Sequence, residues 1–143
     1  MMRLLSLLAC LLPLLAGCGS SESYSVAPVS GQVKVDGKPL QNGYVIFSPV
    51  AQKGNPNPGP GSSGFTDQEG RYTLTIEGKG TNGAVVGKHK VMIDLKVQDD
   101  PADDRPKKIL HLPARYHGRN TKLEFTVPSS GTDHADFLDL TSK

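Results

Sequence analysis

The sequence predicts an all-β protein, an antiparallel seven-stranded β-sandwich that follows a cleaved signal peptide. Apolar residues recur with a period of two in short runs along most of the chain. Turn-forming residues separate these runs about every 8 to 12 residues, and the 143-residue chain contains 16 glycines and 11 prolines. No segment after the leader shows a sustained helical period. This combination favours two packed sheets over a helical or alternating α/β fold.

The first 17 residues form the predicted signal peptide. Arg3 precedes an apolar stretch, residues 4–17, which ends in small residues of the type found before cleavage sites. A membrane-spanning helix needs about 20 apolar residues, and this stretch has 14. We therefore expect the leader to be removed and not to remain as an anchor.

The leader ends in Leu15-Ala16-Gly17-Cys18, which resembles the lipobox of bacterial lipoproteins. The resemblance implies cleavage between Gly17 and Cys18, followed by attachment of acyl chains to the Cys18 thiol. Cys10 leaves with the leader, so lipidation would also explain the one unpaired cysteine of an exported chain. The alternative is an ordinary secretory signal with a stray cysteine.

Residues 18–27 are mostly small and polar and form the predicted lipidated tether, which reaches only about 15 to 18 Å. Residues 28–143 are the predicted domain. Removal of residues 1–17 takes away one charged residue, Arg3, and leaves 15 basic against 14 acidic side chains. This balance argues against nucleic acid as a partner, because phosphate binding needs a concentrated basic face.

The first half of the domain contains two predicted strands and a loop. Residues 29–35 alternate apolar and polar, and Asp36-Gly37 supplies a turn that tolerates positive φ. Residues 44–48 form the next strand, for which we expect both faces to be covered. Residues 49–64 are rich in Gly, Pro, Asn and Ser and form a predicted long exposed loop.

The second half continues the pattern. A hairpin is predicted from Phe65 through the turn 67–70 to the strand 71–76, with Tyr72, Leu74 and Ile76 on one face. The clearest alternation runs over residues 88–97 and precedes a charged loop. The remaining predictions are an irregular or short edge segment and two strands, at residues 109–116, 123–127 and 136–140.

The order of these segments resembles the carboxypeptidase-regulatory-like domain. The motifs are Val29-Ser30-Gly31-Gln32-Val33, Phe65-Thr66-Asp67, Gly70-Arg71-Tyr72 and Gly87-Lys88-His89-Lys90-Val91, with Leu112-Pro113-Ala114-Arg115-Tyr116 toward the end. The resemblance spans about residues 28–140 and implies a transthyretin-like sandwich. In the carboxypeptidases this domain is an accessory beside the catalytic one, so the resemblance implies no activity.

Motifs for chemistry are weak, and we expect no catalytic residues and no cofactor. Residues 59–64 read G-x-G-x-x-G, but neither a preceding βαβ unit nor a following helix accompanies them. His111 and His117 are weak metal candidates at a spacing typical of no known ligand pair, and surface or edge-strand positions are the default for the histidines. Asp67 with Glu69, and the aspartates of residues 99–104, are interpreted as turn and solvated-loop residues.

The functional hypothesis is a non-catalytic protein of the cell envelope, anchored by lipid and facing the periplasm or exterior. Gly19 and Ser20 after Cys18 favour the outer membrane. Its sandwich would bind or scaffold an envelope protein or a glycan, through a loop surface or an exposed sheet edge. The alternative is a carrier of a small ligand or metal in the periplasm.

Overall fold

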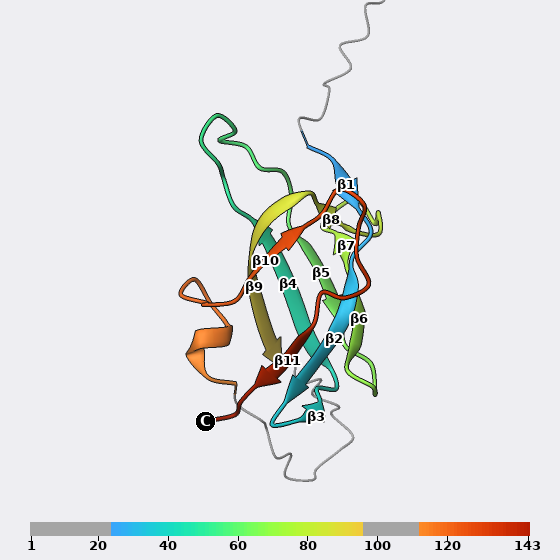
Figure 1. The fold of residues 1–143 in the computed structure, drawn as a ribbon, viewed down its shortest axis with the longest axis vertical. Helices are drawn as coiled ribbons and strands as arrows, with labels where there is room; N and C mark the ends of the chain where they lie inside the picture. Colours follow the sequence, from blue (N-terminus) through green and yellow to red (C-terminus); the bar gives the residue numbers. More distant parts are fainter. Residues whose placement is uncertain (1–23, 96–111) are drawn as a thin grey trace, which may run out of the picture.

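The computed structural model describes residues 24–95 and 112–143, which form an all-β fold of two facing sheets (Figure 1). Residues 1–23 and 96–111 lie outside the described part, so the predictions made for Gly17, Cys18, His111 and the acidic loop lie outside it too. The described strands are β1 (Val26–Ala27), β2 (Ser30–Val35), β3 (Lys38–Pro39), β4 (Gly43–Pro49), β5 (Ser62–Phe65), β6 (Arg71–Thr73), β7 (Thr75–Ile76), β8 (Ala84–Val85), β9 (Gly87–Leu95), β10 (Glu124–Val127) and β11 (Phe137–Leu140). A 3₁₀ turn, η1 (Ala114–Tyr116), accompanies them.

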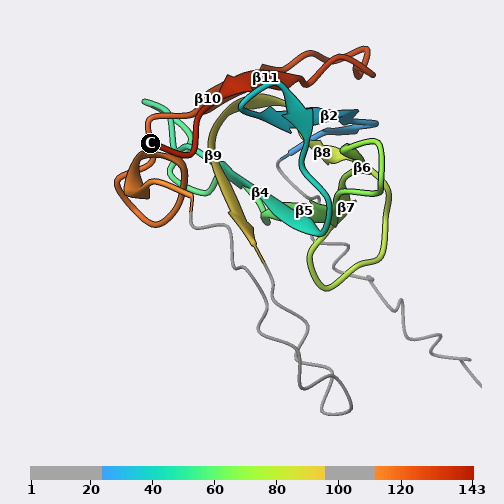
Figure 2. The ribbon, with the colours of Figure 1, turned by 90° about the horizontal axis from the view of Figure 1, so that it is seen from below.

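The larger sheet has five strands in the order β10-β9-β4-β5-β7, all antiparallel. The second sheet has the order β11-β2-β3, and β6 also pairs with β2. Figure 2 shows β4, β5 and β7 in one layer and β2 with β11 in the other. A short pair of strands, β1 and β8, closes one end.

The core lies between the two sheets and is built by the predicted alternation. The inner-facing residues of β2, β4 and β9 are almost fully buried, which confirms the predicted inner face. Phe47 is central, since its ring lies 5.5 to 6.5 Å from four other rings. Those rings belong to Tyr72, His89, Phe125 and Phe137. Tyr44 and Ile46 on the opposite face of β4 are half-buried, so that face is only partly covered.

The prediction of a purely antiparallel sandwich is wrong at one strand pair. β11 runs parallel to β2, with Phe137 opposite Val33 and Leu140 opposite Val35. A long connection separates the two strands in sequence, so their relative direction is not constrained by a tight turn. The described residues contain eleven strands, and seven of these have three or more residues.

The predicted hairpin after Phe65 is divided between the two sheets. β5 pairs with β7, whereas β6 pairs with β2 across the sandwich. Tyr72, Leu74 and Ile76 are nevertheless buried as predicted, because the strand changes partner without reversing its inner face. The loop prediction for residues 49–64 is wrong at its end, since Ser62 to Gly64 belong to β5 and Ser62 is fully buried.

The folded part begins within the segment expected to be tether. Val26 and Ala27 form β1 and pair with Val85 and Ala84. The Asp36-Gly37 turn has the predicted positive φ angles, 51° and 74°. A strand of two residues gives no periodic signal, so the sequence does not distinguish β1 from a linker.

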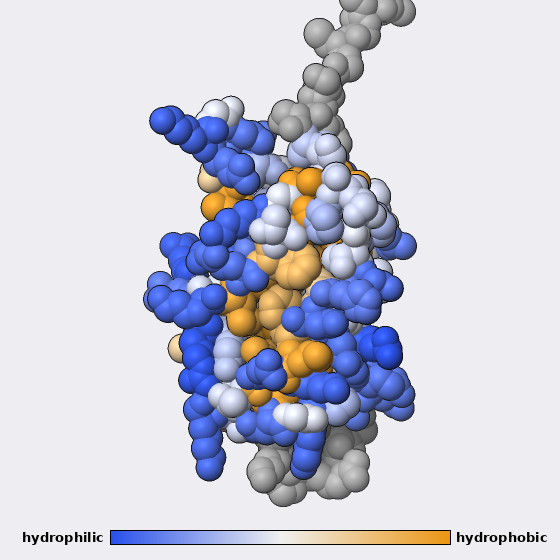
Figure 3. All heavy atoms as spheres, in the orientation of Figure 1, coloured by the Kyte–Doolittle hydropathy of each residue, from blue (hydrophilic) through white to orange (hydrophobic). Residues whose placement is uncertain are grey.

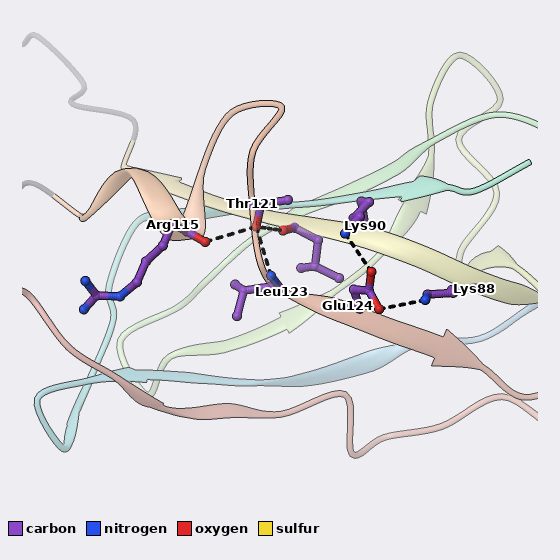
Figure 4. A network of polar contacts seen from close by, with 7 residues as sticks. Lys88, Lys90, Arg115, Thr121, Leu123 and Glu124 are labelled. Carbon is purple, nitrogen blue, oxygen red and sulfur yellow. Dashed lines mark hydrogen bonds and ion pairs between the residues drawn. The ribbon is translucent and has the colours of Figure 1, made fainter.

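Polar contacts attach β10 and η1 to β9 (Figure 4). Thr121 donates to the Val91 carbonyl at 2.6 Å and accepts a hydrogen bond from the Leu123 amide at 3.2 Å. Glu124 lies 2.8 Å from Lys88 and 2.6 Å from Lys90. Hydrogen bonds from these two ammonium groups lower the pKa of Glu124 to about 2.

Candidate functional site

A groove of about 700 Å³ lies on the outer face of β2 and β6. We call it the outer-face groove. Its floor comes from the outward residues of β2 and β6, and the segment 133–136 forms one wall. Phe65, the last residue of β5, and Asp67, two residues farther along the chain, complete it. The lining side chains include Gln32, Phe65, Asp67, Arg71, Thr73, Asp133, His134 and Asp136.

The floor follows from strand register. Ser30 lies opposite Thr73, Gly31 opposite Tyr72, and Gln32 opposite Arg71. Because side chains alternate between the faces of a strand, Gly31 and Tyr72 point into the core while the other four point outward. The groove floor is therefore polar on a strand pair whose other side is fully buried.

The wall is held in place from beneath. A Cβ on Gly31 would overlap the carbonyl oxygen of Ala135, so the chain approaches β2 as closely as glycine allows. The Tyr72 hydroxyl donates to the same carbonyl at 2.6 Å, and the Ala135 amide donates to Ser30 at 3.0 Å. Because Tyr72 and Ala135 are both buried, the wall is held in one position and is preorganised.

Carboxylates dominate the charge of the groove. Asp136 Oδ1 accepts a hydrogen bond from the backbone amide of Gln32 at 2.8 Å, and Asp136 Oδ2 lies 3.7 Å from His134 Nδ1. Asp133 lies 3.3 Å from His134 Nε2. Burial, reinforced by the negative charge of Asp136, raises the pKa of Tyr72 well above its ordinary value. Tyr72 therefore stays protonated and remains a hydrogen-bond donor.

Arg71 and Phe65 give the groove two further kinds of contact. The Arg71 side chain is exposed and carries up to five donors in a planar fork. Phe65 is 55% exposed and stacks against Tyr44 at 4.7 Å between ring centroids. Planar polar groups beside an exposed aromatic ring can hold a polar, extended ligand through hydrogen bonds and ring contact.

Asp67 serves the backbone, as the sequence predicted. Its Oδ1 accepts hydrogen bonds from the amides of Glu69 and Arg71, at 2.9 and 2.8 Å. These bonds confirm the interpretation of Asp67 as a turn residue. They also fix the start of β6, and with it the position of Arg71.

One histidine, His89, does not lie at the surface or edge position expected for the histidines. His89 is fully buried on β9, which is an interior strand of its sheet, so the default of a surface or edge position is wrong there. It lies in phase with Val91 and Ile93, so the alternation of this strand places it on the inner face. Its Nδ1 lies 2.9 Å from the Gly87 carbonyl, and burial lowers its pKa.

The weak metal candidates are not brought together in the described part. His117 Nε2 lies 3.1 Å from the Leu112 carbonyl, and His111 is outside the described residues. Residues 24–95 and 112–143 contain no group of three or more His, Cys, Asp or Glu side chains arranged to hold a metal ion. Within the same ranges no helix is long and apolar enough to cross a membrane.

A second surface feature is apolar. Figure 3 shows apolar side chains gathered along the middle of the face that carries β10 and β11. β10 ends the larger sheet, β11 ends the smaller one, and Phe125 meets Phe137 between them at 6.4 Å. Leu138 is 39% exposed beside this contact.

The groove residues were not identified from the sequence. Arg71 and Thr73 could have been identified as the outward positions of a predicted strand. Asp133 and Asp136 carry no local signal, because only the parallel return of β11 brings them beside β2. In comparisons with known proteins, no family model, no curated protein and no solved structure matches this chain.

Proposed function

We propose that this chain is an exported bacterial lipoprotein whose β-sandwich binds or scaffolds a protein or glycan partner without catalysing a reaction. Cleavage before Cys18 and acylation of its thiol would anchor it to a membrane of the cell envelope. Two or three acyl chains give stable attachment, whereas one is marginal. The outer membrane, facing the periplasm or exterior, is the favoured address.

The outer-face groove is the observation that carries the binding proposal. Its floor offers the Arg71 fork, and the exposed Phe65 ring lies at its edge. Its wall offers carboxylate oxygens and is fixed by contacts with Gly31 and Tyr72. Polar groups held rigidly lose little entropy when a ligand binds, so they favour recognition. Hydroxyl-rich sugars and extended polar peptides both match this combination of groups.

The finer identity of the fold is part of the same proposal. We assign the sandwich to the transthyretin-like, carboxypeptidase-regulatory-like type because most of the quoted motifs fall on strands of the structure. Val29-Ser30-Gly31-Gln32-Val33 enters β2, Gly70-Arg71-Tyr72 enters β6, and Gly87 opens β9. An accessory domain of this type suits a binding role.

Site-specific crosslinking in intact cells tests the binding role. A photoreactive residue replaces Thr73 on the groove floor, and a matched one replaces Thr126, which is exposed on β10 away from the groove. We expect a discrete higher-mass adduct from position 73, sensitive to protease or glycosidase according to the partner. Equal labelling at both positions would contradict the groove as the binding site.

Mass spectrometry of the protein from its native cells tests the anchor. We expect the intact mass of residues 18–143 plus at least one diacylglyceryl group. A free thiol at Cys18, or a retained leader, would overturn the lipoprotein assignment while leaving the crosslinking result interpretable.

A further inference from the structure

One end of the sandwich gathers the N-terminal entry and the proline-rich loop. The described chain enters beside β1, next to the loop of residues 50–61 and the β7–β8 connection, whereas β3 and the C-terminus lie at the opposite end (Figure 1). Tyr24, Gln52, Asn55 and Pro58 line one hollow of about 210 Å³ there. We call the segments 24–27, 50–61 and 77–88 the tether end.

The entering chain is fastened to this end and does not leave it freely. Lys79 Nζ donates to the Tyr24 hydroxyl at 2.6 Å, and a Cβ on Gly59 would lie 2.9 Å from the Tyr24 ring. Six residue steps separate Tyr24 from Cys18. Even fully extended, six residues span at most about 22 Å.

The charge of the tether end is positive. Its segments contain three lysines, Lys53, Lys79 and Lys88, against one acidic residue, Glu77. Lys88 shares Glu124 with Lys90, so these three side chains together keep one net positive charge. Val26 is 38% exposed on the same end. Lysines near a membrane surface are attracted to anionic headgroups. An exposed apolar side chain such as Val26 can be buried at the boundary between headgroups and acyl chains.

We infer that the tether end is a membrane-docking surface that rests on anionic lipid headgroups and holds the sandwich upright on the bilayer. The inference rests on the lipid anchor of the proposed function, because the short span from Cys18 brings this end to the bilayer first. The nine residues of β9 run about 30 Å along the sandwich, so the end carrying Lys38 stands that much farther out. The outer-face groove, on the side of the sandwich, then stays open to partners in the aqueous phase.

Headgroup quenching of a fluorophore measures this orientation. Acylated Cys18 leaves the mature chain without another thiol, so one introduced cysteine can be labelled uniquely. Asn57→Cys reports the tether end without removing a tether-end lysine, and Lys38→Cys is the control at the opposite end, since both side chains are exposed. The lipidated full chain is reconstituted in vesicles with 30% anionic lipid that carry a nitroxide on the headgroup.

We expect much stronger quenching at position 57 than at position 38, because nitroxide quenching falls steeply with distance and the two ends are separated by about the 30 Å length of β9. Replacing anionic with zwitterionic lipid, or raising salt to about 1 M, should reduce this difference, since charge attraction is then screened. Equal quenching at both positions on verified lipidated protein would overturn the docking surface alone. Absence of acyl mass in the same sample would instead overturn the anchor.

Discussion

The two faces of β2 and β6 have opposite environments, since one packs in the core and the other is open to solvent. On the inner face, Gly31 and Tyr72 meet the backbone of Ala135 in a contact that leaves no room for another atom. On the outer face, Gln32, Arg71 and Thr73 line an open groove. The same two strands therefore pack closely against the 132–136 segment on one face and present a polar surface to solvent on the other.

This difference indicates how a small domain can present polar groups in fixed positions. The inner contacts fix the wall, and the outer residues can vary without loss of core packing. Substitutions on the inner face should therefore change stability and groove shape together, while those on the outer face should change binding alone. Four predictions separate the two faces, in order of decreasing effect on the fold.

Gly31→Ala should have the largest effect. The added Cβ would overlap the Ala135 carbonyl, which is backbone and cannot rotate away. Overpacking of this kind costs about 1 to 3 kcal/mol of unfolding free energy. Urea denaturation measures the loss, and Gly118→Ala, at a glycine with nothing near its Cβ position, is a control for substitution in open space. Because Gly118 has a φ of 70°, the control includes local strain, and a Gly31 effect no larger than it would refute the close approach.

Tyr72→Phe should come next. It removes the hydroxyl that donates to Ala135 and leaves a buried carbonyl without that partner, at a cost of about 1 to 2 kcal/mol. The ring stays packed near Phe47, so the core volume is kept. Tyr44→Phe, which removes a hydroxyl bonded at the half-buried Ser63, is the matched control and should cost less. Equal losses would show that the Ala135 contact has no special role.

Much of the fold could be predicted because it rests on local signals. Alternation places Val33, Val45, Phe47 and Ile93 inside, and all four are fully buried. The Asp36-Gly37 turn follows from the positive φ that these residues tolerate. What failed were pairings between distant segments. The parallel return of β11 and the change of partner between β6 and β7 depend on tertiary packing, which no local window contains.

The groove escaped prediction for the same reason. Its wall and its floor are more than 60 residues apart in sequence where Tyr72 meets Ala135. His89 shows a different error, since a surface or edge position is the default for a histidine while the alternation of β9 places this one inside. Charged neighbours on a strand point to the other face, so they say little about the residue between them.

The pH dependence of stability compares an inner with an outer histidine. Burial lowers the pKa of His89 in the folded protein below the value of about 6.5 expected for the unfolded chain. The unfolded state therefore binds the proton more readily as pH falls below that value, so unfolding free energy should decrease. Above it both states hold His89 neutral, and this contribution disappears.

Urea denaturation between pH 5 and 8 measures the slope. His89→Phe should flatten the part of the slope near the histidine range, since a phenyl ring can pack beside Phe47 without titrating. His134→Phe, at a side chain that is 81% exposed, is the matched control, and only the change in slope beyond that of the control is assigned to the burial of His89. A slope that survives in His89→Phe would assign the effect to other groups.

Arg71→Ala should have the smallest effect on the fold and a clear effect on binding. The side chain is exposed, and Asp67 holds the Arg71 backbone amide, which the substitution keeps, so the stability change should stay within about 0.5 kcal/mol. If the guanidinium donates to the partner, its loss should weaken binding by about 1.5 kcal/mol, roughly tenfold. Crosslinking yield at position 73 measures this, with Arg119→Ala as the matched control outside the groove. An Arg71→Ala protein that unfolds more easily but keeps full crosslinking would reverse the division between the faces, because the outer residue would then support the fold and not the partner.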